Sequence, residues 1–579
     1  MALDLTPEQR AIGRQNFEQA SGDLARAGKM GNSLAVGGTD RRDFMKSVIA
    51  AGSVVPVSAA VYFGYQTWKG NKAVKTAFIG VGDEGGVLVG DHNPEFNEIV
   101  AVCDIRPSNI KRIYEGEPAG PRKGLNKIYG KDTAKKIESF DSLDKLLEAK
   151  DRLGIEMVVI ATPLNTHDVI TKACMDKGLH VLCEKLMARD VTRCKDMIKY
   201  GKDKGLLLNI GHQRHYSSLY AQALEVVETG ILGDIKHIRA LWHRNNSWAY
   251  SPSASDSEKF AVKEFGLPYY NDGWFKPVPK EDAAYLTQDK LKQLAFGDQE
   301  RYGFKDAGEL VRWRCFDKTG GGLMAELGSH QLDASSIILG HVKPLAVSGV
   351  GGKFFYRPGQ NDRESDDSVF VTFEFPGDNH PKGRKKGNDK DDIVIVTYSS
   401  FNTNSFEEYG ECVMGSKGTM VIEKEKDVFL FREPDKAKKT EGGRDTKINV
   451  TVGEKGEAKA EAASTWGGGG AAIAKGSSGP AWDTPVRGYR TEMEHFAFCV
   501  REWGKEKVSY EKDKDGHLKE AKRMPRCHGE VAMADAIMAL VSNMAMDKKQ
   551  RIVFEDAWFD GTSAEVPETK YGKKGSATA

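Results

Sequence analysis

Residues 74–85 combine a short apolar run with three glycines at a fixed spacing. The run Val74–Ile79 has the composition of a buried strand and leads directly into Gly80-Val81-Gly82-Asp83-Glu84-Gly85. In a G-x-G-x-x-G loop the first glycine permits a tight turn, the second lets the backbone approach a pyrophosphate, and the third permits close helix–strand packing. A helix that begins here offers its N-terminus to phosphates. The segment predicts the first β–α unit of a dinucleotide-binding Rossmann domain, with Gly80, Gly82 and Gly85 at the cofactor.

A second apolar run, residues 99–103, ends at Asp104, which lies 19 residues after Gly85. An acidic side chain at this spacing is expected to meet the ribose hydroxyls of the adenosine. Because a carboxylate repels a phosphate on that ribose, Asp104 favours NAD over NADP, although Arg106 can soften the preference. The alternative interpretation of Asp104 is a plain turn residue.

The α/β rhythm continues beyond this unit. Residues 157–161 form a continuous apolar run, as expected for a parallel strand that is covered on both faces. We expect a helix from about 167 to 177, a further strand at 178–183 and another at 206–210. Ligands in such sheets bind at the carboxyl ends of the strands, so Glu184 and Lys185 stand where chemistry is expected.

Together, these residues resemble the Gfo/Idh/MocA family of oxidoreductases. The likeness runs from about residue 74 to about 345, with a weaker echo to residue 560. It rests on the glycine loop, Ala161-Thr162-Pro163 with His167, Cys183-Glu184-Lys185-Leu186, and Gly320-Gly321-Gly322 followed by Glu326-Leu327-Gly328-Ser329-His330-Gln331-Leu332-Asp333. Two departures are Leu186, where the family has proline, and Glu326, where it has aspartate.

The resemblance implies a fold of two units. An α/β Rossmann domain with a parallel sheet is expected at 71–212, after an N-terminal leader at 1–70. An α+β C-terminal domain with a large, open and mainly antiparallel sheet is expected at 213–579, with loop insertions at 376–392 and 433–485. Strands are expected near 234–244, 369–375, 393–398 and 418–422, and helices near 488–503 and 529–546. The resemblance also implies a homo-oligomer formed through the C-terminal sheet.

The resemblance also implies a catalytic group of three side chains, Lys185, Glu326 and His330. Glu326 and His330 are four residues apart, hence on one face of a helix, where the carboxylate can orient the imidazole. His330 is then expected to take a proton from a substrate hydroxyl, while Lys185 stabilises the developing alkoxide. Without the family resemblance, a helix cap with a buried histidine explains Glu326 and His330 equally well.

The binding residues implied by the resemblance fall into two groups. The expected cofactor is NAD, with NADP as the alternative, and it is expected to be tightly bound. Besides the loop glycines and Asp104, the cofactor-binding residues are Thr162, Pro163, His167 and Glu184. The candidate substrate-binding residues are Arg214, Tyr216, His243 and Trp313.

The N-terminal segment resembles an export signal. Arg41 and Arg42, with Phe44 and Lys46 close behind, precede 22 uncharged residues from Ser47 to Trp68. This pattern is similar to a twin-arginine signal and predicts a periplasmic protein that uses the twin-arginine export machinery. The alternative is a membrane anchor at residues 47–68, since about 20 apolar residues can span a bilayer. Thr6-Pro7-Glu8-Gln9 has the composition of a helix start.

Composition limits the remaining classes of protein. The 84 basic and 83 acidic side chains nearly cancel, so no surplus of charge argues for nucleic acid. The eight cysteines include no C-x-x-C pair, and Cys527-His528 lacks a visible partner pair. We therefore predict neither a nucleic-acid partner nor a metal site.

The sequence as a whole predicts an NAD(P)-dependent oxidoreductase that transfers hydride to or from a hydroxyl carbon of a carbohydrate, polyol or glycoside. Two alternatives are an NAD-dependent glycosidase, which oxidises the sugar transiently, and a non-catalytic sugar- or nucleotide-binding protein on the same fold. The departures at Leu186 and Glu326 keep the binding protein in consideration.

Overall fold

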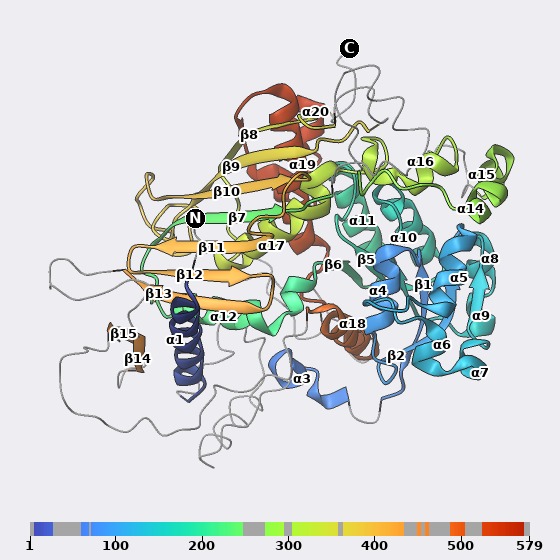
Figure 1. Cartoon of the computed structure of the whole chain (residues 1–579), viewed down its shortest axis with the longest axis horizontal. Coiled ribbons are helices and arrows are strands. Elements are labelled where there is room, and N and C mark those ends of the chain that lie inside the picture. Colours follow the sequence, from blue (N-terminus) through green and yellow to red (C-terminus); the bar gives the residue numbers. More distant parts are fainter. Residues whose placement is uncertain are drawn as a thin grey trace.

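In the computed structural model of the chain, two large sheets lie side by side (Figure 1). A parallel α/β unit lies on the right of the view, and a broad second sheet lies on the left. The structure describes residues 5–26, 59–68, 71–246, 272–294, 304–356, 363–433, 448–452, 458–462, 487–503 and 524–572.

The first unit is a six-stranded parallel sheet with the strand order β3-β2-β1-β4-β5-β6. The predicted parallel sheet is confirmed, and each predicted strand is present. The additional strand β3 is short and polar, which explains why the hydrophobic pattern missed it. The strands are β1 (Val74–Ile79), β2 (Asn97–Cys103), β3 (Glu138–Phe140), β4 (Met157–Ile160), β5 (His180–Glu184) and β6 (Leu208–Gly211). The helices are α4 (Asp83–Asp91), α5 (Pro107–Glu115), α6 (Leu125–Tyr129), α7 (Lys131–Ala134), α8 (Leu143–Glu148), α9 (Lys150–Leu153), α10 (His167–Asp176) and α11 (Val191–Lys204).

The second unit is an eight-stranded sheet with the order β13-β12-β11-β7-β10-β9-β8-β16. Strands β7 and β10 pair in parallel and the other neighbours are antiparallel, which confirms the predicted, mainly antiparallel sheet. The strands are β7 (Ile235–His243), β8 (Ala346–Gly352), β9 (Ser368–Pro376), β10 (Ile393–Phe401), β11 (Tyr409–Gly415), β12 (Gly418–Glu423), β13 (Asp427–Arg432) and β16 (Ile552–Val553). A separate hairpin pairs β14 (Ile448–Val452) with β15 (Ala458–Ala462).

Helices from the second half of the chain join the two sheets. α17 (Ser329–Ile338) and α19 (Gly529–Lys548) pack against each other, and a single apolar core continues from the first sheet through both helices into the second sheet. The other helices are α12 (Ser218–Glu228), α14 (Lys280–Tyr285), α15 (Gln288–Leu294), α16 (Ala307–Val311), α18 (Tyr489–Trp503) and α20 (Pro567–Tyr571). A π-helical turn, η5 (Met324–Gly328), leads directly into α17.

The N-terminal segment contributes two pieces to the described structure. α1 (Pro7–Arg26) packs on β13, where Asn16 Nδ2 donates to the Leu430 carbonyl at 2.9 Å. α3 (Ala59–Tyr62) and the turn after it pack into the core on the other face of the parallel sheet, and Trp68 stacks on Phe96 at 4.3 Å between ring centroids. The predicted arginine pair and residues 47–58 lie outside the described residues.

Among the described residues, α19 is the one helix that is long and apolar enough to cross a membrane. Buried residues make up 83% of its apolar window, as in a core helix.

Candidate active site

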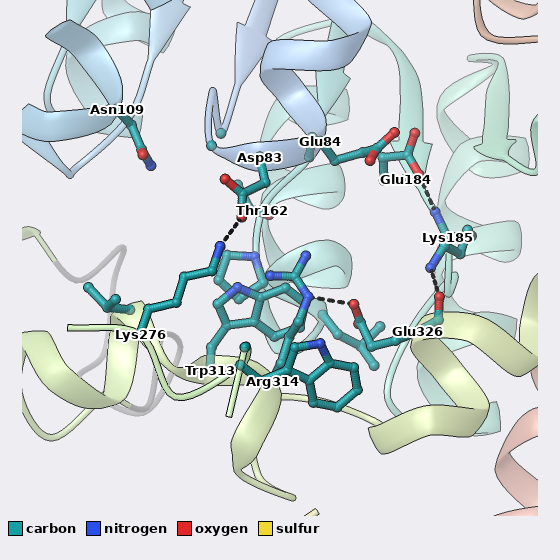
Figure 2. A pocket seen from close by; sticks show the side chains of 18 of the residues that line it. Asp83, Glu84, Asn109, Thr162, Glu184, Lys185, Lys276, Trp313, Arg314 and Glu326 are labelled. Atoms are coloured by element: carbon teal, nitrogen blue, oxygen red, sulfur yellow. Dashed lines mark hydrogen bonds and ion pairs between the residues drawn. The ribbon is translucent and has the colours of Figure 1, made fainter. Parts of the chain in front are cut away.

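A cavity of about 1060 Å³ opens between the two units (Figure 2). One wall is formed by the carboxyl ends of β1, β4 and β5 with the glycine loop. The opposite wall comes from the end of β7, the turn η5 and the segments around Lys276 and Trp313. Most of the predicted site residues line this one cavity: Gly80, Gly82, Asp104, Thr162, Pro163, His167, Glu184, Lys185, His243, Trp313, Glu326 and His330.

The glycine loop has the geometry that its three glycines predict. Gly80 has φ +82°, and an added Cβ would lie 2.5 Å from the Ala161 carbonyl oxygen. A Cβ on Gly85 would lie 2.0 Å from the Gly80 carbonyl oxygen, so this glycine permits close packing. At Gly82 the nearest atom to an added Cβ is 3.4 Å away, which leaves the backbone open at the start of α4. The residues present therefore fit a pyrophosphate at the N-terminus of α4.

Three cations surround Asp83 beside this loop. Lys276 Nζ lies 2.6 Å from the carboxylate, Arg112 Nη1 lies 3.0 Å away and Arg122 Nη2 lies 3.8 Å away (Figure 2 labels Asp83 and Lys276). Burial raises the pKa of Asp83, but Lys276 and the arginines outweigh it, so the pKa lies below its usual value. Sequence reasoning missed these cations, because they come from segments far apart in the chain.

Asp104 is fixed by the loop that it was predicted to serve. Its carboxylate accepts from the backbone N–H groups of Val81 at 2.9 Å and Arg106 at 2.8 Å, and from Asn109 Nδ2 at 3.0 Å. Burial raises its pKa, and these hydrogen bonds act in the opposite direction. Arg106 Nε donates to the buried Asp282 at 2.8 Å, so this guanidinium already has a carboxylate partner.

Two carboxyl groups face each other across the floor of the cavity. Glu84, in the glycine loop, and Glu184, at the end of β5, lie together in Figure 2. Burial raises the pKa of both groups, and the nearby Glu84 raises the pKa of Glu184 further. This pair is expected to hold a proton at neutral pH, because two adjacent buried carboxylates repel each other.

Lys185 is held with its ammonium group at the junction of the two units. Nζ donates to the carbonyl oxygens of Glu326 at 2.8 Å and Ala325 at 3.4 Å (Figure 2). A lysine ammonium has three protons, so one donor is left for the cavity. The Lys185–Leu186 peptide is cis, and Leu186 is buried.

His167 contacts the turn at Lys185–Leu186. Its Nδ1 lies 2.8 Å from the Leu186 carbonyl oxygen and its Nε2 lies 2.9 Å from the Thr162 carbonyl oxygen. Burial lowers the pKa of His167. Both ring nitrogens therefore bridge the loops after β4 and β5, and this histidine positions the predicted cofactor residues around it.

His330 lies in the first turn of α17, with its ring 5.3 Å from that of Trp242. Burial and the neighbouring Lys185 and Arg214 lower the pKa of His330 well below its usual value, so the imidazole is neutral. The backbone carbonyl of His330 accepts a hydrogen bond from Arg214. Within the described ranges no hydrogen bond involves the His330 ring nitrogens, so they are available to a ligand in the cavity.

The predicted pairing of Glu326 with His330 is wrong. The Glu326 carboxylate accepts from Arg314 Nε at 2.6 Å (Figure 2), and Glu326 lies in the π-helical turn that precedes α17. Burial raises its pKa, but Arg314 and Lys185 outweigh this effect and the net pKa is lowered. Glu326 therefore remains charged and holds Arg314 in the cavity wall.

Two of the four predicted substrate residues are not in the cavity. Arg214 is fully buried, with Nη1 3.1 Å from Glu411 and Nη2 2.6 Å from Glu425. Tyr216 is also buried, and its hydroxyl donates to Asn209 at 2.9 Å. The structure therefore places neither side chain in the cavity: Arg214 pairs with carboxylates from distant segments, and Tyr216 pairs with Asn209 of β6.

The other two predicted substrate residues line the cavity. The His243 ring contacts the Phe406 carbonyl and the Ser399 hydroxyl, each at 2.9 Å, so it is braced within the protein. Trp313 lies under the Arg314 guanidinium, 4.3 Å from the charged carbon to the ring centroid. Arg244 stacks in the same way on Trp242, at 4.8 Å. Stacked aromatic and cationic side chains of this kind suit a hydroxyl-rich ligand.

The fold and the cavity define a Rossmann-type dinucleotide-binding protein whose second domain completes the site. The family model "Oxidoreductase family, NAD-binding Rossmann fold" matches residues 74–212, and the model "GFO/IDH/MocA C-terminal domain" matches residues 297–421. Residues 74–212 and 297–421 thus match the two domain models of the Gfo/Idh/MocA oxidoreductases, the family that the sequence resembles.

Curated relatives match shorter stretches of the chain. A glycosyl hydrolase family 109 protein of Stenotrophomonas maltophilia is 28% identical over 246 residues, which cover 40% of this chain and 48% of that protein. Inositol 2-dehydrogenase 1 of Saccharopolyspora erythraea is 31% identical over 93 residues, 16% of this chain and 27% of that protein. The chain thus spans about half or less of the length of these relatives.

A solved structure shares the fold. The oxidoreductase domain protein from Kribbella flavida has a TM-score of 0.51 and 14% sequence identity, over 84% of this chain and 100% of that one.

Proposed function

We propose that this protein is an NAD-linked oxidoreductase that acts on a CH–OH group of a carbohydrate, polyol or glycoside. The observation that carries the proposal is the convergence of Lys185 and His330 on the cavity that also contains the glycine loop. The match of residues 74–212 to the model of an NAD-binding oxidoreductase family supports the reaction class, and the similarity to an inositol 2-dehydrogenase supports a hydroxyl-rich substrate.

In this proposal the chain's own residues manage the proton and the charge on oxygen. The neutral imidazole of His330 takes the hydroxyl proton of the substrate as general base. The free proton of the Lys185 ammonium hydrogen-bonds the same oxygen and stabilises its developing negative charge. The nicotinamide, when bound, supplies the hydride acceptor, or the donor in the reverse direction.

The geometry around Asp104 supports NAD as the preferred cofactor. The carboxylate is fixed at the end of β2 by two backbone N–H groups and by Asn109, where it can accept from ribose hydroxyls. Arg106 was expected to soften this preference, but it pairs with Asp282. A ribose phosphate would thus meet the negative charge of Asp104 and a cation that is already neutralised.

The test begins with the small molecules that the purified protein releases on denaturation, identified by mass spectrometry. About one NAD per chain supports a tightly bound cofactor. A panel of sugars, polyols and glycosides is then assayed with wild type, Lys185→Met and His330→Ala. Lys199→Met, at an exposed lysine of α11, is the matched control. If the protein binds a sugar but turns over no compound of the panel, the oxidoreductase proposal is wrong and a binding protein takes its place.

An NAD-dependent glycosidase is the second candidate, because the similarity to the glycosyl hydrolase family 109 protein covers the larger share of this chain. In that reaction the cofactor is restored in each cycle. Steady cleavage of an aryl glycoside without added NAD, and without accumulation of free NADH, would favour the glycosidase over the dehydrogenase.

We also propose that the protein is exported to the periplasm and forms a homo-oligomer. The arginine pair before the apolar run supports export.

On β8, Gly349 and Gly351 face Met546 of α19, so Val350 between them points to the open face of the sheet, where it is 62% exposed. Phe370 on β9 is also exposed, which supports an interface on this sheet. Light scattering of wild type and Phe370→Lys tests the assembly.

A further inference from the structure

A second polar cluster lies beyond the cavity, where three elements meet. His212 follows β6, Asp333 lies on α17 one turn after His330, and Asp535 lies on α19. One potential ligand atom from each side chain lies within 4.8 Å of the other two. The three side chains are fully buried, with residue exposures of 0%, 1% and 2%. No sequence spacing indicated this cluster.

The facing atoms of the cluster are not satisfied by the protein. Within the described part of the chain, both ring nitrogens of His212, Asp333 Oδ2 and Asp535 Oδ1 have no hydrogen-bond partner. His212 Nδ1 lies 3.9 Å from Asp333 Oδ2. Buried polar atoms are nearly always paired, because an unpaired group forfeits its hydration. Several such atoms within 4.8 Å of one another indicate a ligand between them.

The other oxygen of Asp333 is held separately. His215 Nε2 lies 2.7 Å from Asp333 Oδ1, and the His215 ring stacks on His341 at 5.4 Å between centroids. This contact fixes the orientation of the carboxyl group and leaves Oδ2 for the cluster. Carboxylates that bind metals are commonly oriented by a hydrogen bond of this type from a neighbouring residue.

We propose that His212, Asp333 and Asp535 bind one divalent transition-metal ion. An imidazole nitrogen with two carboxylate oxygens suits Zn²⁺, Mn²⁺ or Fe²⁺; all-oxygen sites favour Mg²⁺ or Ca²⁺, and thiolate sites favour Cu(I). A divalent cation balances the charge of two buried carboxylates and satisfies an atom of each ligand. A proton shared by the two carboxyl groups would satisfy Asp333 and Asp535 but would leave the His212 ring unpaired.

The position of the site defines its role. It joins the last strand of the Rossmann sheet to the helix that carries His330 and to the core helix α19. The ion would therefore fix α17 relative to β6, and so His330 relative to Lys185. His212, Asp333 and Asp535 are positioning residues in this scheme. The site is independent of the reaction proposed above.

The experiment measures metal content by inductively coupled plasma mass spectrometry. The full chain is purified without an immobilised-metal column, from cells grown with trace metals. We expect about one transition-metal ion per chain in wild type. Asp535→Asn keeps the side-chain volume, and we expect it to lower the content to about a tenth or less. Asp547→Asn, an exposed carboxylate on the same helix, should match wild type.

A second measurement uses the wild-type chain alone and so does not depend on a folded variant. The protein is treated with a chelator and titrated with Zn²⁺ or Mn²⁺ by calorimetry, and thermal unfolding is followed with and without the ion. We expect one binding site and a higher Tm with metal. His215→Gln should weaken the affinity roughly 10–100-fold while leaving the three ligands in place.

Clear results would overturn the proposal. Wild type that contains no metal and binds neither ion after chelation would leave a shared proton or a water molecule in the cluster. An Asp535→Asn variant with wild-type metal content would place the ion elsewhere. Because metal content is measured without turnover, failure of the proposed reaction would leave these results unchanged.

Discussion

Replacing Asp104 with asparagine is expected to narrow the preference for NAD over NADP. In the structure the carboxylate is fixed by the backbone N–H groups of Val81 and Arg106, at 2.9 and 2.8 Å. The substitution removes the negative charge at nearly constant volume. It also weakens some of these hydrogen bonds, but that structural loss affects both nucleotides equally and cancels in the ratio of their Kd values.

The magnitude follows from the charge alone. Two like unit charges about 4 Å apart at the edge of a protein repel by about 4 kcal/mol. That energy corresponds to roughly a thousandfold in the ratio of Kd values, because 1.36 kcal/mol is a factor of ten. Asp104→Asn should therefore narrow the preference for NAD by up to about this factor. The added substitution Asp282→Asn frees Arg106 and should improve NADP binding by a further factor of about ten.

The assay is calorimetric titration of nucleotide-free protein with NAD⁺ and NADP⁺ at fixed salt. Asp132→Asn, at a fully exposed carboxylate on α7 of the same domain, is the control and should leave both Kd values unchanged. A wild-type protein that binds NADP⁺ as tightly as NAD⁺ would refute the reasoning. An Asp104→Asn ratio equal to that of wild type would show that the carboxylate does not face the ribose.

Three further predictions follow from the site and its charges. Because the pKa of His330 is held well below its usual value, kcat/KM should stay flat as pH falls through 6.5, and a break at that pH would contradict the assignment of the base. Arg314→Met should remove the partner of Glu326 and lower the free energy of unfolding by about 1–3 kcal/mol, as measured by urea denaturation. This cost is smaller than that of breaking a fully buried pair, because the Arg314 side chain is 28% exposed. Burial lowers the pKa of His92 to about 4, so between pH 6.5 and 4 the unfolded chain binds a proton that the folded chain does not, and the free energy of unfolding decreases as the pH falls through that window. His92→Gln should make the free energy of unfolding, measured by urea denaturation, depend less steeply on pH in that window. An unchanged slope would exclude His92 as a cause.

Much of the first domain could be predicted from local sequence. β4 is a continuous apolar run, and β1 and β5 are apolar over most of their length, because both faces of a parallel sheet are covered and nearly every side chain is buried. The glycine loop was also predictable, since the positive φ of Gly80 and the close approach of Gly85 to the Gly80 carbonyl are features of one β–α unit. The short strand β3 was missed, because its three residues show no apolar pattern and it gains its identity by pairing with β2.

In the second domain the local signal was weaker. β8 has the sequence Ala-Val-Ser-Gly-Val-Gly-Gly, which resembles a loop, and it is a strand because β9 and α19 pack against it. β11 and β13 were also missed, although each forms a hairpin with β12, which lies between them in the chain, and β13 contains the apolar run Val-Phe-Leu-Phe.

By itself the sequence determined the chemistry of single segments: a glycine loop after a strand, an acid after the next strand, and a lysine and a histidine in the order that the family uses. The tertiary structure decided which charges meet. It turned Arg214 inward to Glu411 and Glu425, which lie about 200 residues further along the chain, and paired Glu326 with Arg314 in place of His330. A buried charge must find an opposite charge or a hydrogen bond, and that partner is chosen by proximity in space, which no spacing in the sequence records.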